Sequence, residues 1–224
     1  MMVGYSKSVY TVKLMYLVFS ICLSVLTGIL AQAVFYVGPI PYTMQNIGII
    51  LSGLLLPPRY ALFSQLFYLL LIALGLPLGA GFRGGLHVIL GYTGGYLVGF
   101  PISATLMSIL CRRYLAKKRL DLGGIGLREY IVILLFSAIA IVPTYVLGFL
   151  VFTHYALRNE RLLMWAIGVA QGVDLFSNSN VLAILLVASI AVFIPQDIFI
   201  DHVIAIGVAK MLIQFLKNRG IEIE

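Results

Sequence analysis

Residues 12–37 read VKLMYLVFSICLSVLTGILAQAVFYV, a stretch with one charge near its start and apolar side chains along most of its length. The hydrocarbon core of a bilayer is about 30 Å thick, so a spanning helix needs about 20 mostly apolar residues. The stretch exceeds that length, and no small-residue cleavage site of a signal peptide follows it. It also lacks the polar–apolar alternation of a membrane barrel strand. The sequence therefore predicts a retained transmembrane helix here.

The composition of the whole chain extends this prediction. Of 224 residues, 62% are hydrophobic and 10% are charged, and the mean hydropathy is +1.07. Soluble domains are about 45–50% apolar and about 25% charged, so lipid must be the solvent for most of this chain. Six spanning helices with short loops would use nearly its whole length. We expect an all-α, polytopic membrane protein with a single membrane-embedded domain over residues 1–224.

Glycines and prolines separate the apolar runs and place the six expected helices. Pro57 and Pro58 end the second helix, and Pro195 opens the last one, because proline is favoured at a helix start. The expected bounds are Val12–Val37, Thr43–Leu56, Tyr60–Leu74, Leu86–Leu115, Glu129–Phe152 and Gln196–Leu216.

Two shorter apolar segments, Leu162–Phe176 and Val181–Ile194, come before the last helix. Apolar stretches of about 10–14 residues are more often re-entrant, interfacial or buried than spanning. We therefore expect a short helical hairpin or lid on one side of the membrane. A hairpin of two spanning helices is the alternative, and it would keep the last helix in the same orientation.

The charges orient the expected helices. With the N-terminus in the cytoplasm, the outer side receives only Arg83, Arg158 and Arg161, and the other twelve of the 15 Lys and Arg residues fall on the inner side. Cytoplasmic loops carry such an excess of basic residues. This predicts a multi-pass protein of the cytoplasmic (plasma) membrane with both termini in the cytoplasm. The net charge of +7 follows these flanking clusters, which argues against a nucleic-acid partner.

Two acidic residues on one face of the last helix, Asp197 and Asp201, are candidates for function. A carboxylate inside a membrane is costly and often marks a partner, a pathway or a ligand. Asp197 has a simpler interpretation as an acid in the first helical turn, where the helix dipole favours it. Asp201 lies one turn deeper, beside His202, which is either its counter-group or a residue bonded to a carbonyl.

The outer loops supply further polar candidates. Arg83 is the only basic residue of the glycine-rich loop (residues 75–85), and a guanidinium matches a carboxylate well. Its alternative role is that of an arginine reaching the membrane interface. Thr43 is interpreted as a helix N-cap, whereas Gln45 must find a partner in another helix or in a ligand.

Small residues recur every four positions on the first helix, at Ser20, Ser24 and Gly28. Such a stripe lets helices approach closely in lipid, either within the bundle or between subunits. Enzyme signatures of the GxSxG, HExxH, CxxC and phosphate-loop types are absent from the sequence, so we expect neither catalysis nor a metal or cofactor. Without a phosphate-binding loop the chain would not hydrolyse ATP by itself.

Several ordered segments resemble the signature of the biotin transporter BioY family. The likeness covers residues 10–115 well and 180–216 weakly. The segments that carry it are GPIPYTMQ (Gly38–Gln45), LSGLLLPPR (Leu51–Arg59), GLP (Gly75–Pro77), GGL (Gly84–Leu86), GYTGGYLVGF (Gly91–Phe100) and FIPQD (Phe193–Asp197).

The resemblance implies a substrate-binding S component of an energy-coupling-factor transporter. Such a protein has six helices and binds its vitamin, here biotin, from outside. It depends on a separate transmembrane coupling subunit and two ATPase subunits. The family docks its coupling subunit through small residues of the first helix, which here would be Ser20, Ser24 and Gly28.

The sequence departs from the family pattern at four places. The loop that usually reads FAGGxGG is GAGFRGG here (residues 79–85). The family usually has a lysine three residues after the motif aspartate, where this chain has Ile200, and Tyr92 replaces a usual proline. About 20 residues around Leu157–Phe176 resemble an insertion. Our hypothesis is that Arg83 supplies the missing positive charge to an acidic solute.

The leading prediction is thus a biotin-binding S component rather than an enzyme. One alternative keeps the architecture and binds another small carboxylated cofactor, such as a lipoate-like acid. Another is an intramembrane enzyme that uses Asp197, Asp201 and His202. The residues expected to contact substrate are Asp197, Arg83, Gln45, Thr93, Tyr96, Asn178, Asn180 and Asp201.

Overall fold

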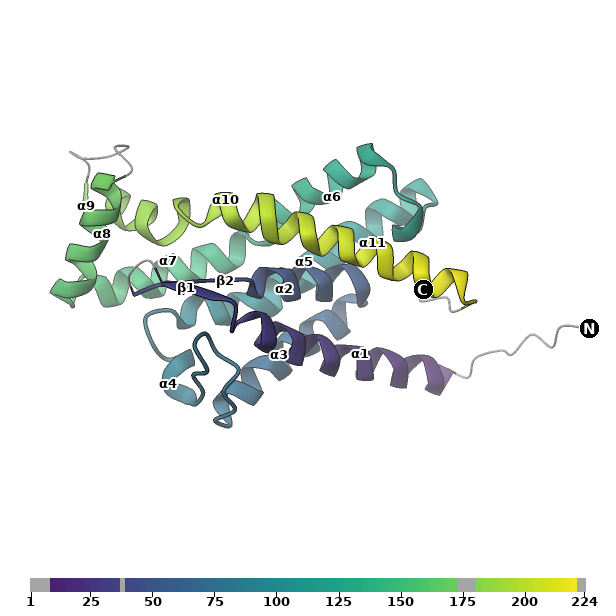
Figure 1. Ribbon diagram of the computed structural model, residues 1–224, viewed down its shortest axis with the longest axis horizontal. Helices are drawn as coiled ribbons and strands as arrows, with labels where there is room; N and C mark the ends of the chain where they lie inside the picture. Colours follow the sequence, from purple (N-terminus) through teal and green to yellow (C-terminus); the bar gives the residue numbers. More distant parts are fainter. Residues whose placement is uncertain (1–8, 37–38, 173–179, 221–224) are drawn as a thin grey trace, which may run out of the picture.

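The computed structural model describes residues 9–36, 39–172 and 180–220, and forms an elongated bundle in which most helices follow the long axis (Figure 1). In chain order the elements are α1 (Val9–Leu30), β1 (Val34–Tyr36), β2 (Pro41–Thr43), α2 (Gln45–Leu55), α3 (Pro58–Ala73), α4 (Leu86–Ile89), α5 (Gly94–Lys118), η1 (Leu122–Gly124), α6 (Leu127–Ala140), α7 (Val142–Ala156), α8 (Glu160–Gly172), α9 (Val181–Leu186), η2 (Val187–Ala191), α10 (Ile194–Gln196), η3 (Asp197–His202) and α11 (Val203–Asn218).

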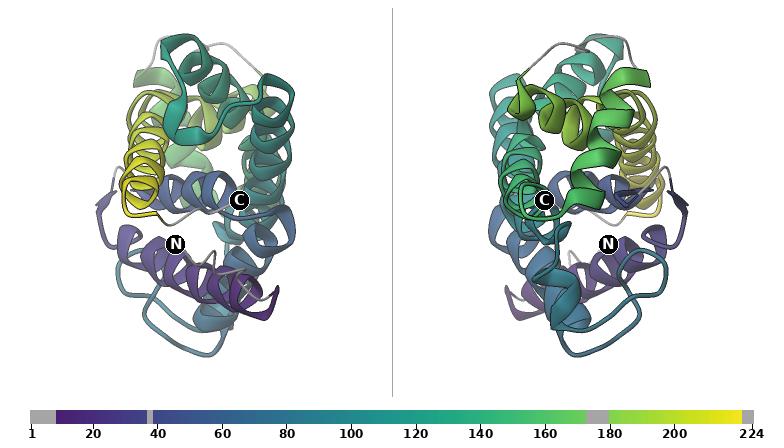
Figure 2. Two further views of the ribbon diagram at one scale, coloured as in Figure 1. Left: turned by 90° about the vertical axis from the view of Figure 1, so that its right-hand side faces the viewer. Right: turned by 90° about the vertical axis from the view of Figure 1, so that its left-hand side faces the viewer.

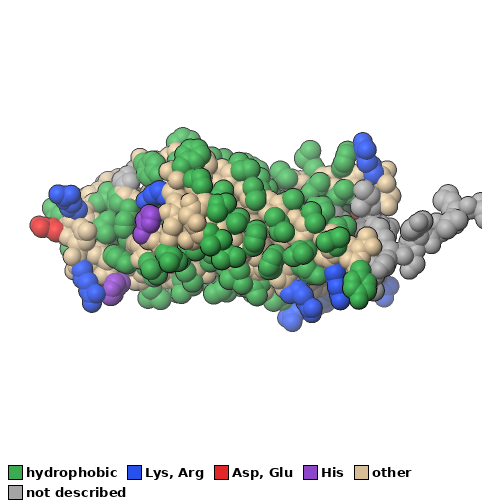
Figure 3. All heavy atoms as spheres, turned by 90° about the horizontal axis from the view of Figure 1, so that it is seen from below, with side chains coloured by type: hydrophobic (Ala, Val, Ile, Leu, Met, Phe, Trp, Pro, Cys, Tyr) green, Lys and Arg blue, Asp and Glu red, His purple; other side chains and the backbone are tan. Residues whose placement is uncertain are grey.

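The surface of the bundle matches a lipid environment. Hydrophobic side chains cover its middle, while Lys and Arg side chains gather near its two ends (Figure 3). In the described ranges, four helical segments are long and apolar enough to cross a bilayer, namely Tyr10–Leu30, Gly94–Lys118, Leu127–Ala156 and Val181–Asn218. The prediction of an all-α, multi-pass membrane protein is confirmed.

Several predicted helices appear near their expected bounds. The expected helices Thr43–Leu56 and Tyr60–Leu74 correspond to α2 and α3, and both are shorter than the four long segments. The expected helix Glu129–Phe152 is α6 continued by α7, with Pro143 in the first turn of α7. The lengths of the apolar runs between prolines and glycines were therefore sufficient to predict where these helices lie.

Two predicted helices end or break earlier than expected. The first stops at Leu30, and residues beyond it form the antiparallel hairpin of β1 and β2, in which Phe35 pairs with Tyr42. The helix expected over Leu86–Leu115 is divided into α4 and α5. A Cβ atom at Gly94 would lie 1.7 Å from the carbonyl oxygen of Ile89, so glycine is needed where the chain turns between them.

The prediction that the last helix opens after Pro195 is wrong. The helical segment runs from Val181 to Asn218 and contains two π-helical stretches, η2 and η3, on either side of Pro195. In lipid, a proline that cannot donate is tolerated where local π-helical geometry re-satisfies the freed carbonyls. Asp197 consequently lies well inside a long helix, so its interpretation as a first-turn acid is wrong as well.

The expected hairpin before the last helix is only half right. Its second limb, Val181–Ile194, is the beginning of the long final helical segment. Its first limb is α8, which lies across the end of the bundle rather than along it (Figure 1 and Figure 2). There α8 packs on α7 and η2 through Leu162 and Ala166, next to Phe152 and Ala188.

Close helix contacts bring the pocket-lining elements together. Within α2, every residue except Asn46 is buried, so this short helix forms the centre of the bundle. Helices α5 and α7 approach through glycine: a Cβ atom at Gly99 would lie 2.4 Å from the Cα atom of Thr144, and one at Gly148 would lie 2.3 Å from the ring of Tyr96. Only glycine permits this spacing.

Candidate binding pocket

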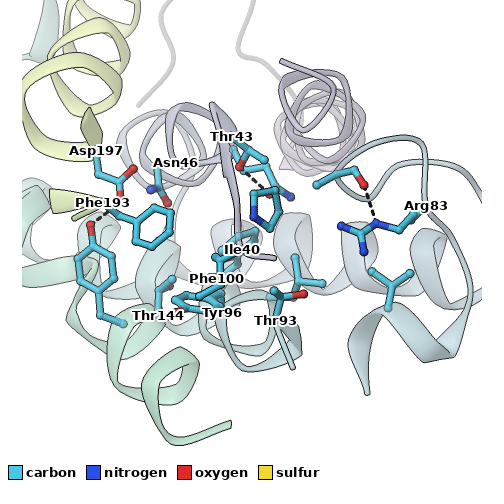
Figure 4. A pocket seen from close by; sticks show the side chains of 16 residues that line it. Ile40, Thr43, Asn46, Arg83, Thr93, Tyr96, Phe100, Thr144, Phe193 and Asp197 are labelled. Atoms are coloured by element: carbon cyan, nitrogen blue, oxygen red, sulfur yellow. Dashed lines mark hydrogen bonds between the residues drawn. The ribbon is translucent and has the colours of Figure 1, made fainter. Parts of the chain in front are cut away.

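A pocket lies near the end of the bundle that carries β2 and the first turn of α2 (Figure 4). Its walls come from β2, α2, the glycine-rich loop, α5, α7 and the final helical segment. Of the residues predicted to contact a substrate, five line it together: Gln45, Arg83, Thr93, Tyr96 and Asp197. Residues far apart in the sequence thus converge on one hollow.

Asp197 lies at one end of the pocket and is only 5% exposed. The hydroxyl of Tyr145, on α7, donates a hydrogen bond of 2.5 Å to its Oδ2 atom. Asn46, on α2, interacts with the same carboxylate from the pocket side (Figure 4). A buried carboxylate held in this way remains an acceptor for further N–H or O–H donors of a ligand.

Gln45 lines the pocket, but its amide is already bonded within the protein. Thr43 Oγ1 donates to Gln45 Oε1 over 2.8 Å, and Gln45 Nε2 donates to the Tyr68 hydroxyl over 2.6 Å. The Tyr68 hydroxyl then donates to the Leu78 carbonyl over 3.0 Å. This chain of bonds links α2, α3 and the glycine-rich loop, so Gln45 helps to shape the pocket whether or not a ligand touches it.

Arg83 lies at the other end of the pocket, across from Asp197 (Figure 4). Its side chain is exposed, and its Nε atom donates to the Ala80 carbonyl over 3.0 Å. The loop that carries it turns through two residues with positive φ, Gly81 at 67° and Phe82 at 58°. Arg83 lines the pocket, so its remaining guanidinium donors are available to a carboxylate there.

Thr93 and Tyr96 line the pocket from the start of α5. The Tyr96 hydroxyl donates to the Ser189 carbonyl over 2.6 Å, which ties α5 to η2. Tyr96 therefore offers a ligand its ring face rather than a free hydroxyl proton.

Two other predicted contact residues do not line the pocket. Asn180 is exposed and caps α9, where its Oδ1 atom accepts from the Leu182 N–H over 2.7 Å. Asp201 is fully buried one turn beyond Asp197 and outside the pocket-lining set, with Gln196 as a polar neighbour. Helix capping explains the position of Asn180. Burial alone does not explain Asp201, because its two carboxylate oxygens are buried with no hydrogen-bond partner among the described residues. Asn178 lies outside the described residues.

Several pocket residues were not singled out from the sequence. Asn46, Thr144 and Tyr145 supply polar groups, and Phe100 and Phe193 supply aromatic walls. Asn46 is the one polar residue beside Gln45 in an otherwise apolar helix start, a signal that could have been used. Tyr145 carries no such signal, because its role depends on the contact between α7 and η3.

The small-residue stripe of α1 faces the bundle. Ser20 and Ser24 are fully buried, and their hydroxyls donate to the carbonyls of Tyr60 and Ser64 on α3 over 3.2 and 2.5 Å. A Cβ atom at Gly28 would lie 2.7 Å from the Leu78 side chain. Of the two interpretations of this stripe, packing within the bundle is the one seen here. A partner could reach these residues only if α1 moved away from α3.

The profile of the BioY family matches residues 6–218 of this chain. The chain belongs to the BioY family. This agrees with the resemblance found in the ordered motifs.

Curated BioY proteins align with the chain over part of its length. The probable biotin transporter BioY of Pyrococcus horikoshii is 48% identical over 84 residues, which are 38% of this chain and 52% of that protein. The biotin transporter BioY of Thermotoga maritima is 41% identical over 76 residues, 34% of this chain and 45% of that protein. The chain thus matches about half the length of these curated relatives.

A solved structure has the same fold as this BioY family member. It is the crystal structure of the S-component for biotin from an ECF-type ABC transporter. The TM-score is 0.64 at 24% sequence identity, and the match covers 95% of this chain and 94% of the other. The likeness in fold extends through the long final helical segment and is not confined to the aligned motifs.

Proposed function

We propose that this protein binds biotin from the outer side of the membrane, as the S component of an energy-coupling-factor uptake transporter. Membership of the BioY family supports the proposal, and so do the similarity to known biotin transporters and the shared fold with an S-component for biotin. The single observation that carries it is the arrangement of the pocket, with a buried carboxylate, Asp197, at one end and a guanidinium, Arg83, at the other.

Biotin has the chemistry that this arrangement requires. Its bicyclic end carries a urea with two N–H donors, and its other end is a carboxylate on a hydrocarbon chain. Asp197 can accept from a urea N–H, and Asn46 can serve the urea carbonyl or the second N–H. Arg83 would hold the carboxylate. Phe100 and Phe193 would cover the rings and the hydrocarbon between the two ends, as apolar walls do in small-molecule sites.

The energy for uptake would come from other subunits, namely a transmembrane coupling subunit and two ATPase subunits. In this proposal, α2 and α3 complete six crossings together with the four long segments. The first helix begins and the last one ends at the same end of the bundle (Figure 1), as an even number of crossings requires. The excess of basic residues on the predicted inner side supports an orientation with both ends in the cytoplasm, in a cytoplasmic-membrane protein that acts as one substrate-binding domain.

The two alternatives differ in what they leave unexplained. A lipoate-like acid could use Arg83, but it has no urea, so Asp197 and Asn46 would face its apolar ring. The enzyme alternative required Asp197, Asp201 and His202 to share a site. Asp201 and His202 are buried outside the pocket-lining set, and the named relatives are transporters, so we do not retain it.

Equilibrium binding to the purified protein in lipid nanodiscs tests the proposal. We expect saturable binding of labelled biotin that unlabelled biotin displaces. A hundredfold excess of lipoate should leave labelled biotin bound. Displacement by lipoate at the same concentration as biotin would favour the second ligand, and no saturable binding of either would refute the assignment.

A further inference from the structure

One side chain joins the outer end of α1 to the glycine-rich loop. Gln32 follows α1 in the turn before β1, and it is half-buried. Its Oε1 atom accepts from the Phe82 N–H over 2.8 Å. Its Nε2 atom donates to the Gly79 carbonyl over 3.2 Å and to the Gly28 carbonyl of α1 over 2.8 Å.

These bonds bracket the turn that presents Arg83. The N–H of Gly79 donates to the Arg83 carbonyl over 2.8 Å, so the two residues close the turn between them. Phe82, directly before Arg83, has a positive φ of 58°, a conformation that costs energy for a residue with a side chain. The bond from Phe82 to Gln32 holds the backbone in that conformation.

The rest of the loop is bonded mainly to α3, although Gln32 Nε2 also lies 3.5 Å from the Pro77 carbonyl. The Leu78 carbonyl accepts from Tyr68, and the N–H of Gly85 donates to the Ile72 carbonyl over 2.6 Å. Between these two anchors, the loop backbone depends on Gln32 for its bonds to another part of the chain. Gln32 is therefore placed to decide where Arg83 points.

We propose that Gln32 is a positioning residue for Arg83, so that the hold on the ligand carboxylate depends on the location of the outer end of α1. This inference rests on the proposed function, because it assumes that Arg83 binds the ligand carboxylate. Gln32 does not line the pocket and acts through the loop alone.

A consequence for uptake follows from the same contacts. Ser20 and Ser24 of α1 donate to backbone carbonyls of α3, and Gln65 of α3 donates to Thr27 Oγ1 of α1 over 3.3 Å. If a coupling subunit drew α1 away from α3, Gln32 would move with it and release Phe82 and Gly79. Arg83 would then lose its orientation, and the carboxylate end of the pocket would open.

The test compares biotin with biotin methyl ester, in which the charged carboxylate of the tail is replaced by a neutral ester. Gln32→Met keeps the length of the side chain and removes its hydrogen bonds. We expect this variant to bind biotin about five- to tenfold more weakly, the effect of one or two neutral hydrogen bonds. Its affinity for the methyl ester should stay within about twofold of the parent value. Gln171→Met, an equivalent change at an exposed position of α8, is the control and should alter neither affinity.

A double-mutant comparison separates positioning from general stabilisation. In an Arg83→Ala background, Gln32→Met should have no further effect on biotin binding, because the group that it positions is gone. Equal losses for biotin and its ester, or additive losses in the double mutant, would overturn the proposal. An unchanged affinity of Gln32→Met for biotin would do the same.

A measurement without ligand distinguishes this inference from the proposed function. Amide hydrogen exchange over residues 79–83 should become faster in Gln32→Met, while exchange within α3 stays unchanged. If the parent protein failed to bind biotin, the proposed function would fall, yet faster exchange would still show that Gln32 orders the loop. Unchanged exchange would refute the positioning role whatever the ligand.

Discussion

The hydrogen bond from the Tyr145 hydroxyl to Asp197 Oδ2, 2.5 Å long, joins α7 to the final helical segment at the deep end of the pocket. Its presence means that the carboxylate is oriented before a ligand arrives, with its remaining lone pairs directed toward Asn46 and the hollow. Pre-orientation of this kind reduces the free energy that binding must spend on ordering side chains.

We expect Asp197→Asn to weaken biotin binding by about ten- to a hundredfold. A hydrogen bond to a charged acceptor contributes about 1.5–3 kcal/mol, and the amide also turns one acceptor into a donor that faces the urea. Asp201→Asn is the matched control, the same change one turn deeper and outside the pocket lining, and should shift the affinity by less than about threefold. Calorimetry on both purified variants measures the difference. Equal effects of the two changes would show that Asp197 has no special role.

Replacing Arg83 tests the other end of the pocket. We expect Arg83→Ala to reduce affinity for biotin by about three- to thirtyfold, a modest loss because the guanidinium is exposed and partly screened. Arg158→Ala removes an exposed arginine that is also predicted to lie on the outer side, and it should leave binding unchanged. The loss should disappear when the ligand is biotin methyl ester. Equal affinities of the parent and Arg83→Ala proteins for biotin would refute the hypothesis that Arg83 replaces the family's usual lysine, whose position is Ile200 in this chain.

The spacing between α5 and α7 provides a test of how the helices place the site. A methyl group at Gly99 would lie 2.4 Å from the Cα atom of Thr144, next to Tyr145. We expect Gly99→Ala to push α7 outward. This should lower the free energy of unfolding by about 1–3 kcal/mol and weaken biotin binding. Gly168→Ala in α8 meets nothing within 4 Å and should be neutral or slightly stabilising. If Gly99→Ala bound and unfolded like the parent, the close contact would not position Tyr145.

The apolar runs predicted most of the helices, because lipid requires long stretches of apolar residues and tolerates few breaks. The helix start predicted at Pro195 was wrong because a helix in lipid can continue through a proline. Here it does so with π-helical stretches on either side. The pocket was predictable where a polar side chain interrupts an apolar run or the glycine-rich loop, as at Gln45, Arg83 and Asp197. It was not predictable for Tyr145 or Phe193, since nothing in their local sequence shows which helices meet.

The buried small residues of α1 also show that a local sequence pattern does not identify the helix it packs against. A Ser20–Ser24–Gly28 spacing signals close approach of another helix, but the sequence does not say which one. In the structure that neighbour is α3, through the carbonyls of Tyr60 and Ser64. Docking of a coupling subunit on these residues stays a prediction, and it now requires that the α1–α3 contact opens.

The orientation in the membrane is open to a direct chemical test. In a background with Cys22 and Cys111 replaced by serine, single cysteines can be introduced by Arg158→Cys, at the α8 end, and by Lys118→Cys, at the end of α5. The excess of basic residues around Lys118 predicts that this position faces the cytoplasm and Arg158 the outside. A membrane-impermeant maleimide added to intact cells should label position 158 at once and position 118 only after permeabilisation. Labelling in the reverse order would place the pocket mouth on the cytoplasmic side, where a protein that takes up biotin from outside could not first meet its substrate.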